Sequence, residues 1–513
     1  MAETWVAILD FGSQYTQLIA RRVREQHVYS EILRFDVSAE ELKQRKPAGI
    51  IISDGPYSTA DKKAPQCDPA IFELGIPVLG ICYGMHLMAR ALGGTVESGE
   101  LREHGFTRIA VMTGSRLLAG LPKELDTWMS LGDEVAAMPP GFKASARSLS
   151  CPIVLMRNEE RKLFGLQFHP EVEQTQFGES MIHNFLFPIC KCRQEWNTES
   201  WIKTTLQELR DQVGKQGVLL GLSGGVDSSV MAVLLHQAIG KKVTGIFVDN
   251  GLARAGEADQ VEKAFRDSMG MNLMVVDARE RFFKALKGVK DPERKRKIIG
   301  REFVRVFVDE ARKLKNCTFL AQGTIYSDVI ESTVVGKGPR QSIKSHHNVS
   351  GLPKDLSFEL VEPLRDLFKE EVRAVGRALG LPDELVDRQP FPGPGMAVRI
   401  LGEVTEERVS LLQKADLIVQ EEMRKWSRYK RVWQSFAVLL PIRSVGVTDG
   451  KRTYEHVCAL RVVDSADSMS ADWTRVPHDI LDNISKRLIH EVDGINRVVY
   501  DISSKPPATI EWE

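Results

Sequence analysis

Short apolar segments alternate with amphipathic helical segments in two series along this chain, and this alternation limits the fold more than any other feature. The apolar runs of the first series are residues 5–11, 29–34, 48–53 and 77–82. Those of the second series are residues 217–222, 242–249, 272–277 and 318–322. Strands that alternate with helices predict βαβ units and a parallel sheet. We therefore predict an α/β chain with two doubly wound parallel-sheet domains.

Two breaks in the pattern divide the chain into three predicted domains. Residues 188–194 are polar and non-periodic, and a cluster of Pro and Gly at 389–395 forms a natural hinge. Residues after this hinge combine a long helical pattern with several strands, which predicts a small α+β domain. The predicted domains are 1–194, 195–392 and 393–513.

Composition narrows the class of function. The 513 residues include 69 Lys plus Arg and 69 Asp plus Glu, and the sequence pI is about 7.2. A nucleic-acid-binding protein normally has a basic excess, so we expect no nucleic-acid partner. The sequence has no secretory leader pattern and no apolar run near the ~20 residues of a membrane helix, so we expect no membrane partner. Seven scattered Cys do not form a disulfide pattern, which favours a reduced, cytoplasmic protein.

A cysteine lies where an apolar strand meets a helix. Gly80-Ile81-Cys82-Tyr83-Gly84 has the G-x-C-x-G form of a nucleophile elbow, in which glycines permit a sharp strand-to-helix turn. A buried structural cysteine is the alternative. In Phe168-His169-Pro170-Glu171 the histidine and the glutamate are two residues apart, so they share one side of an extended segment. A thiol, an imidazole and a carboxylate together predict nucleophilic catalysis.

These two motifs, with Asp10-Phe11-Gly12-Ser13-Gln14-Tyr15, resemble the triad-type glutamine amidotransferases. That family hydrolyses the side-chain amide of glutamine through a thioester and releases ammonia. The resemblance implies that Cys82 is the nucleophile, His169 the general base and acid, and Glu171 the group that orients His169. It also implies an oxyanion hole made by the backbone N–H groups of Gly55 and Tyr83.

The chain departs from that family at three positions. The usual Gly-Gly-Pro is Asp54-Gly55-Pro56, the usual Gln is His86, and the usual Ser-His-Gly-Asp is Ser130-Leu131-Gly132-Asp133. These departures leave the triad intact but place glutamine recognition in question. An altered or weak glutaminase is therefore an open alternative.

A second strand-to-helix junction carries a phosphate-binding pattern. Its residues are Ser223, Gly224, Gly225, Val226, Asp227, Ser228 and Ser229. Adjacent glycines expose backbone N–H groups, and the hydroxyls and the helix N-terminus add further attraction for an anion. The Walker pattern and its lysine are absent. A plain βα turn is the alternative.

The complete Ser-Gly-Gly-x-Asp-Ser-Ser string resembles the loop of the N-type ATP pyrophosphatases. The resemblance implies that residues 223–229 hold the β- and γ-phosphates of ATP while a substrate oxygen attacks the α-phosphate. Asp227 is the candidate Mg²⁺ ligand, because hard cations prefer carboxylate oxygens. Val248, at the end of the next strand, is a candidate for adenine contact by analogy with other doubly wound sheets.

Five further segments resemble the glutamine-hydrolysing GMP synthase family. They are residues 295–301, 321–326, 344–348, 391–395 and 501–513. The resemblance implies that ammonia replaces AMP on adenylated xanthosine 5′-monophosphate (XMP), giving GMP, with ATP and Mg²⁺ required. It implies XMP contacts by Arg296, Lys505, Ile510 and Glu511, and a homodimer formed by the C-terminal domain.

Two alternatives remain at this stage. The same pair of catalytic domains serves other acceptors, as in NAD⁺ or asparagine synthesis, although those relatives lack the Pro-Phe-Pro-Gly-Pro-Gly hinge and the Lys-Pro-Pro-Ala-Thr-Ile-Glu tail. A non-catalytic nucleotide sensor is the second alternative, and the intact triad and phosphate loop argue against it.

Overall fold

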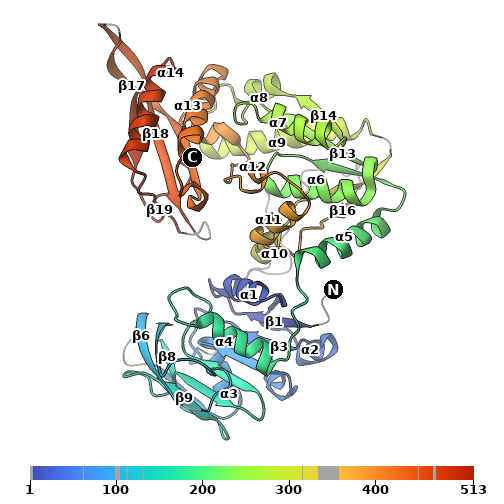
Figure 1. The fold of residues 1–513 in the computed structure, drawn as a ribbon, viewed down its shortest axis with the longest axis vertical. Helices are drawn as coiled ribbons and strands as arrows, with labels where there is room; N and C mark the ends of the chain where they lie inside the picture. The colour runs from blue at the N-terminus through green and yellow to red at the C-terminus, as the bar shows by residue number, and fades with distance from the viewer. Residues whose placement is uncertain are drawn as a thin grey trace. The chain divides into compact units, whose positions relative to one another are not determined.

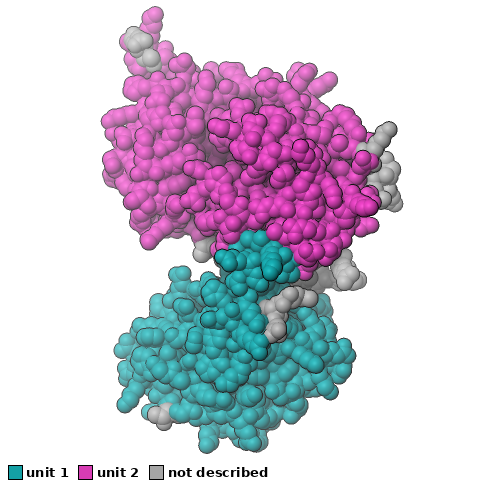
Figure 2. All heavy atoms as spheres, turned by 45° about the vertical axis from the view of Figure 1, so that its right-hand side comes forward, with its two compact units in different colours: residues 1–204, 327–341 teal, residues 205–326, 342–513 magenta. Residues whose placement is uncertain are grey.

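The chain forms two compact units (Figure 2). The computed structural model describes residues 4–61, 63–98, 104–112, 114–130, 132–314, 316–332, 358–448, 450–465 and 470–513. One unit contains Met1–Thr204 with Ser327–Gln341, and the other contains Thr205–Tyr326 with Ser342–Glu513. Each unit has its own sheets and its own hydrophobic core. Among the described residues no helix has both the length and the apolar character that crossing a membrane requires.

The first unit is built on a nine-stranded sheet with the order β2-β1-β3-β4-β11-β10-β9-β6-β7. In that order the strands are Tyr29–Arg34, Trp5–Asp10, Gly49–Ile52, Val78–Ile81, Leu163–Leu166, Leu155–Asn158, Lys143–Arg147, His104–Val111 and Glu124–Ser130. Neighbours from β2 to β11 are parallel, and those from β11 to β7 are antiparallel. A separate antiparallel pair joins β5 (Thr95–Ser98) to β8 (Asp133–Ala137).

Helices cover both faces of the parallel part of this sheet. They are α1 (Thr16–Glu25), α2 (Ala39–Arg45), the 3₁₀ helix η1 (Pro69–Glu73), α3 (Tyr83–Ala91), α4 (Gly178–Asn184) and the π-helix η2 (Phe185–Ile189). Leu9 of β1 shares a core with Leu42 of α2 and Met88 of α3. Ile8 points to the opposite face and is also fully buried. This burial on two faces explains why these strands are continuously apolar.

The second unit contains a fully parallel five-stranded sheet with the order β14-β13-β12-β15-β16. In that order the strands are Asn272–Asp277, Val243–Asp249, Gly217–Gly221, Cys317–Ala321 and Glu359–Val361. The helices of this part are α6 (Val226–Ile239), η3 (Gly240–Lys242), α7 (Glu257–Val261), η4 (Glu262–Ser268), α8 (Arg279–Leu286), α9 (Pro292–Ala311), α11 (Lys369–Ala378) and α12 (Asp383–Val386). Two further helices, α5 (Thr198–Val213) and α10 (Tyr326–Ser332), each contain residues of both units. Here β12 leads through a short turn into α6, the junction that the sequence marks as a phosphate loop.

The C-terminal part of the second unit is a four-stranded sheet packed with two long helices (Figure 1). Its strands are β17 (Gln434–Thr448), β18 (Lys451–Asp464), β19 (Asp472–Trp473) and β20 (Ile495–Asp501), and its helices are η6 (Gly395–Arg399), α13 (Glu406–Arg424), η7 (Tyr429–Arg431) and α14 (His478–Glu491). Strands β17 and β19 are antiparallel to β18, and β20 is parallel to it.

One hydrophobic core joins the two parts of the second unit. It contains Leu219 and Ile246 from the parallel sheet, Leu412 and Val419 from α13, and Leu460 from β18. The C-terminal sheet therefore packs as part of this unit rather than as an independent lobe.

The predicted fold class is confirmed: the chain is α/β, with two parallel-sheet parts and a C-terminal α+β part. The hairpin β17–β18 continues beyond its apolar parts, residues 435–442 and 456–463. Beyond Pro441 it extends into solvent, and its Val447 and Tyr454 are 74% and 61% exposed. Since neither face of this extension is buried, its sequence lacks the alternation that marks a strand.

Candidate active sites

Cys82 lies at the sharp turn between β4 and α3. Its φ of 46° and ψ of −105° place a non-glycine residue in a strained region of backbone conformation. The turn requires the two glycines beside it, because a Cβ on Gly80 would lie 2.6 Å from the Gly84 carbonyl and one on Gly84 would collide with Ile52. The Cys82 N–H donates to Leu166 O at 2.7 Å, which fixes the turn to β11. The predicted nucleophile elbow is present.

The structure brings the three predicted triad residues together. Cys82 Sγ lies 3.6 Å from His169 Nε2, and His169 Nδ1 lies 2.8 Å from Glu171 Oε1. The side chains of His169 and Glu171 are 2% and 0% exposed. Thr175 Oγ1 donates to His169 O at 2.6 Å, and the Tyr15 ring packs edge-on against the imidazole at 4.9 Å. These contacts hold the ring with one nitrogen toward the thiol and the other toward the carboxylate.

Burial and charge shape the acid–base properties of this group. Burial raises the pKa of the Cys82 thiol to about 11, with the His169 ring opposing this change and the Asp54 carboxylate adding to it. Burial alone would lower the pKa of His169, but the negative charges of the Cys82 sulfur and the Glu171 carboxylate raise it well above its usual range. These charges therefore stabilise the imidazolium that forms once the thiol proton has moved to Nε2, since the rise depends on a negative sulfur.

The two residues predicted for the oxyanion hole lie beside the triad. The Tyr83 N–H is at the first turn of α3, and it donates to Asp54 Oδ1 at 3.1 Å. The other oxygen, Asp54 Oδ2, is 3.8 Å from His169 Nε2. Gly55 follows directly, and a Cβ there would lie 2.8 Å from Phe11 O. The carboxylate of Asp54 thus occupies the space in front of the Tyr83 amide.

The phosphate loop forms the predicted turn between β12 and α6. Gly224 has a φ of 74°, and Gly225 is the N-cap of α6. The hydroxyls of Ser223 and Ser228 are 3.0 Å apart, and Gly225 N donates to Ser223 Oγ at 3.3 Å. Ser229 Oγ is fully buried, with no hydrogen-bond partner among the described residues. Backbone amides and hydroxyls thus gather at a helix N-terminus, as anion binding requires.

Three cations that the sequence analysis missed, Lys369, Arg373 and Arg388, line the cavity at this loop. The cavity, of about 330 Å³, is also lined by Asp227 and Val248. Lys369 Nζ is 2.7 Å from both carboxylate oxygens of Asp227. Arg388 Nη1 donates to Gly224 O at 2.7 Å and its Nη2 to Glu257 at 2.6 Å. Lys369 is the first residue of α11, and the helix dipole disfavours a cation at that end of a helix. A lysine at this unfavourable position is the sequence feature that could have indicated a functional role for Lys369.

The C-terminal tail is anchored by buried cations. Arg399 is fully buried and makes two hydrogen bonds to the Glu511 carboxylate, at 2.8 and 3.0 Å. Lys295 pairs with the Glu513 carboxylate, and Arg296 donates to the Glu513 carbonyl. Three of the four residues predicted to bind XMP therefore lie on or against the end of the tail: Arg296, Ile510 and Glu511.

The fourth, Lys505, lies further back in the tail. Its backbone pairs with Ala471, with N···O distances of 2.7 and 3.1 Å. Arg399 is a contact of the tail that the sequence analysis missed, although a lone arginine in the apolar stretch 396–401 marks it.

Three protein families match successive parts of the chain. Residues 7–189 match Glutamine amidotransferase class-I, residues 197–304 match NAD synthase, and residues 421–512 match GMP synthase C terminal domain. A glutamine-hydrolyzing GMP synthase from Geobacillus kaustophilus is 55% identical to the chain over 513 residues, which is 100% of both proteins. The chain belongs to the glutamine-hydrolysing GMP synthase family.

Two further relatives in this family agree. The glutamine-hydrolyzing GMP synthases of Bacillus cytotoxicus and Brachyspira hyodysenteriae are each 54% identical over 508 residues, covering 99% of this chain and 99% of their own. The resemblance to the GMP synthase family is therefore confirmed over the whole length. The segment 344–348, part of that resemblance, lies outside the described residues.

Of the three departures from the amidotransferase pattern, His86 belongs to a buried polar chain. His86 Nε2 is 2.8 Å from Gln167 Oε1, and Gln167 Nε2 donates to Asp133 O at 3.1 Å. Asp133 Oδ2 accepts from Ser58 Oγ at 2.6 Å. Burial lowers the pKa of His86, so the neutral ring donates to Gln167. Leu131 lies outside the described residues.

The residues at the phosphate loop fit a magnesium ion bound together with phosphate. Mg²⁺ usually takes one or two carboxylates and completes its shell with phosphate oxygens and water. Asp227 supplies one carboxylate at the mouth of the cavity, with the Ser223 and Ser228 hydroxyls beside the same loop. The Lys369 ammonium now balances the Asp227 charge, so a cation entering here would displace that ion pair.

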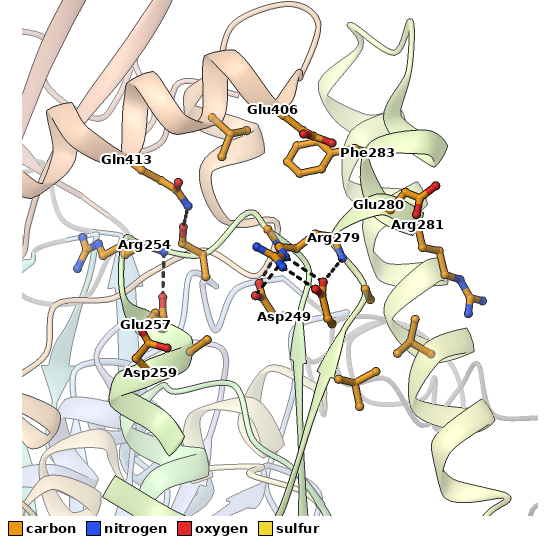
Figure 3. A pocket seen from close by; sticks show the side chains of 18 of the residues that line it. Asp249, Arg254, Glu257, Asp259, Arg279, Glu280, Arg281, Phe283, Glu406 and Gln413 are labelled. Atoms are coloured by element: carbon orange, nitrogen blue, oxygen red, sulfur yellow. Dashed lines mark hydrogen bonds and ion pairs between the residues drawn. The ribbon is translucent and has the colours of Figure 1, made fainter. Parts of the chain in front are cut away.

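A larger cavity, of about 1050 Å³, opens at the carboxyl ends of β13 and β14 (Figure 3). It shares Ala253 and Glu257 with the cavity at the phosphate loop. Its central charges neutralise each other, since Arg279 lies 2.6 Å from Asp277 and 3.8 Å from Asp249. The phosphate loop is therefore the better candidate for binding a polyanion.

Proposed function

We propose that this chain makes GMP from XMP, ATP and glutamine. The first unit releases ammonia from glutamine, and the second transfers AMP to XMP, releases pyrophosphate and exchanges the AMP for ammonia. The observation that carries the proposal is the 3.6 Å approach of Cys82 Sγ to His169 Nε2 in a chain that also has a complete pyrophosphatase loop. The full-length similarity to glutamine-hydrolyzing GMP synthases supports it.

In the proposed glutaminase reaction Cys82 gives its proton to His169 Nε2 while Sγ attacks the amide carbon of glutamine. Glu171 holds the Nδ1–H and stabilises the imidazolium that forms. The oxyanion would be held by the N–H groups of Tyr83 and Gly55. His169 then returns the proton to the departing nitrogen, ammonia leaves, and water cleaves the thioester to glutamate with His169 again as base.

In the proposed adenylation, the N–H groups and hydroxyls of residues 223–229 hold the β- and γ-phosphates, and Val248 lies near the adenine. The C2 oxygen of XMP attacks the α-phosphorus, and the bond to pyrophosphate breaks. Mg²⁺, held by Asp227, would neutralise charge on the departing pyrophosphate. Lys369 and Arg388 lie at the same loop and would attract the triphosphate before it reacts.

We also propose that Arg296, Lys505, Ile510 and Glu511 bind XMP, as the family resemblance implies. The arginine and the glutamate lie at the anchored end of the tail, which supports a site there. The proposed domains are 1–194, 195–392 and 393–513, of which the last two share one hydrophobic core.

A homodimer and a cytoplasmic location complete the proposal. Strands β17 and β18 expose Ile442, Val445, Val447 and Tyr454 by 55%, 39%, 74% and 61%. Exposed apolar side chains on adjacent strands favour a protein contact, and a second copy of the chain is the proposed partner.

Product analysis tests the proposal. Enzyme with XMP, ATP, Mg²⁺ and either glutamine or ammonium should yield GMP, AMP and pyrophosphate. Cys82→Ala should abolish the glutamine-dependent reaction and retain the ammonium-dependent one. Formation of ADP and orthophosphate would contradict the adenylation, and turnover of deamido-NAD⁺ or aspartate in place of XMP would contradict the acceptor. Equal loss with both nitrogen sources in folded Cys82→Ala would contradict the two-site scheme.

A further inference from the structure

The carboxylate of Asp54 lies where an amide substrate would react. One oxygen accepts from the Tyr83 N–H at 3.1 Å, and the other is 3.8 Å from His169 Nε2. Ligand atoms of Asp54, Cys82 and His169 all lie within 4.8 Å of one another. The carboxylate therefore contacts the proposed oxyanion donor and faces the proposed acid–base group.

An amide substrate needs the same space and the same donor. As the thiol attacks, the substrate carbonyl oxygen becomes negative and must accept from a backbone N–H. An Asp54 oxygen already carries negative charge and already accepts from Tyr83. Its charge also disfavours the Cys82 thiolate, since like charges in a buried site repel strongly.

The surrounding backbone fixes Asp54 but leaves its side chain free to turn. Ser53 is fully buried, and its hydroxyl accepts from Phe11 N at 3.0 Å and donates to Asp54 O at 2.8 Å. On the other side Gly55 packs closely against Phe11. The Asp54 side chain is 23% exposed, so rotation about its own bonds can carry the carboxylate out of the site.

We infer that Asp54 is an internal competitor of glutamine, whose carboxylate occupies the Tyr83 amide in the resting enzyme and must turn away before the amide can react. The inference rests on the proposed glutaminase function. It makes Asp54 a positioning residue that sets how readily the first unit hydrolyses glutamine. A chain with a small residue at this position would have an open oxyanion hole.

Glutamate release by Asp54 variants tests the inference. Loss of one oxyanion donor slows an enzyme by roughly 10²–10³-fold, so clearing the donor should raise kcat/KM for glutamine by at least about 10-fold in Asp54→Ala. Asp54→Asn keeps the shape and an acceptor but removes the charge, so its increase should be smaller. Asp61→Ala, which removes an exposed carboxylate from the same segment, should match the parent enzyme.

Cys82 alkylation gives a second readout that does not depend on glutamine. Asp54→Ala should speed iodoacetamide labelling of Cys82 at neutral pH and shift its pH profile downward, with Cys82→Ala as the blank for other thiols. An unchanged glutaminase rate and an unchanged profile in Asp54→Ala would overturn the inference. Ammonium-dependent GMP formation is measured alongside as a separate test of the proposed function. If the proposed function is wrong, the parent enzyme makes no GMP from glutamine or from ammonium; if only the inference about Asp54 is wrong, the parent enzyme still makes GMP.

Discussion

Glu171→Gln tests how much the buried carboxylate contributes to glutamine hydrolysis. The substitution keeps the side-chain volume but removes the charge that faces His169 Nδ1 at 2.8 Å in a site with 0% exposure of Glu171. A hydrogen bond to a charged group contributes about 1.5–3 kcal/mol. Since the imidazolium forms only during reaction, this loss falls on the transition state, and kcat/KM for glutamine should drop by roughly 10–150-fold.

The assay is glutamate release at several glutamine concentrations, with ammonium-dependent GMP formation as a check on folding. Glu173→Gln is the matched control, because Glu173 is two residues further along and exposed. It should retain the parent rate. A Glu171→Gln enzyme that hydrolyses glutamine within about twofold of the parent would refute the role of this carboxylate, because a 1.4 kcal/mol loss already gives tenfold.

Two further predictions concern the other charged contacts. Lys369→Met removes the ammonium that lies 2.7 Å from Asp227. It should reduce XMP-dependent adenylation, measured by pyrophosphate release, by roughly 10–150-fold with either nitrogen source. Lys313→Met, which changes an exposed lysine, should leave the rate of adenylation unchanged. Equal rates in the two variants would exclude Lys369 from the site. Because burial raises the pKa of the Cys82 thiol to about 11, its alkylation rate should rise about tenfold per pH unit from pH 7 to 9, and a flat profile would instead indicate a preformed thiolate–imidazolium pair.

The triad could be predicted because its signals are local. The glycines around Cys82 and the two-residue spacing of His169 and Glu171 each report a backbone geometry that neighbouring residues determine. The approach of Asp54 to Cys82 has a different origin. Parallel pairing of β3 with β4 places Ile52 opposite Gly80, and continuing that register two residues brings Asp54 beside Cys82. The register could be inferred only once the strand order was known.

The cations at the phosphate loop could not be predicted from spacing. Lys369 lies 142 residues from Asp227, and Arg388 lies 164 residues from Gly224. Their positions depend on how α11 and the segment after α12 pack against α6, and this packing is set by apolar contacts spread over the unit. The exposed end of the β17–β18 hairpin could not be predicted because its side chains are hardly buried. A strand with little burial does not need alternating apolar and polar residues, so its sequence carries no strand pattern.

The single core that runs through the second unit has a consequence for anyone who wishes to dissect the enzyme. Cutting the chain at the Pro-Gly hinge would strip Met396, Ala397 and Ile400, all fully buried, of the side chains that cover them. Each of the two fragments would then expose a large apolar surface and tend to aggregate. Chimaeric proteins made from homologues should therefore exchange residues 205–513 as one segment.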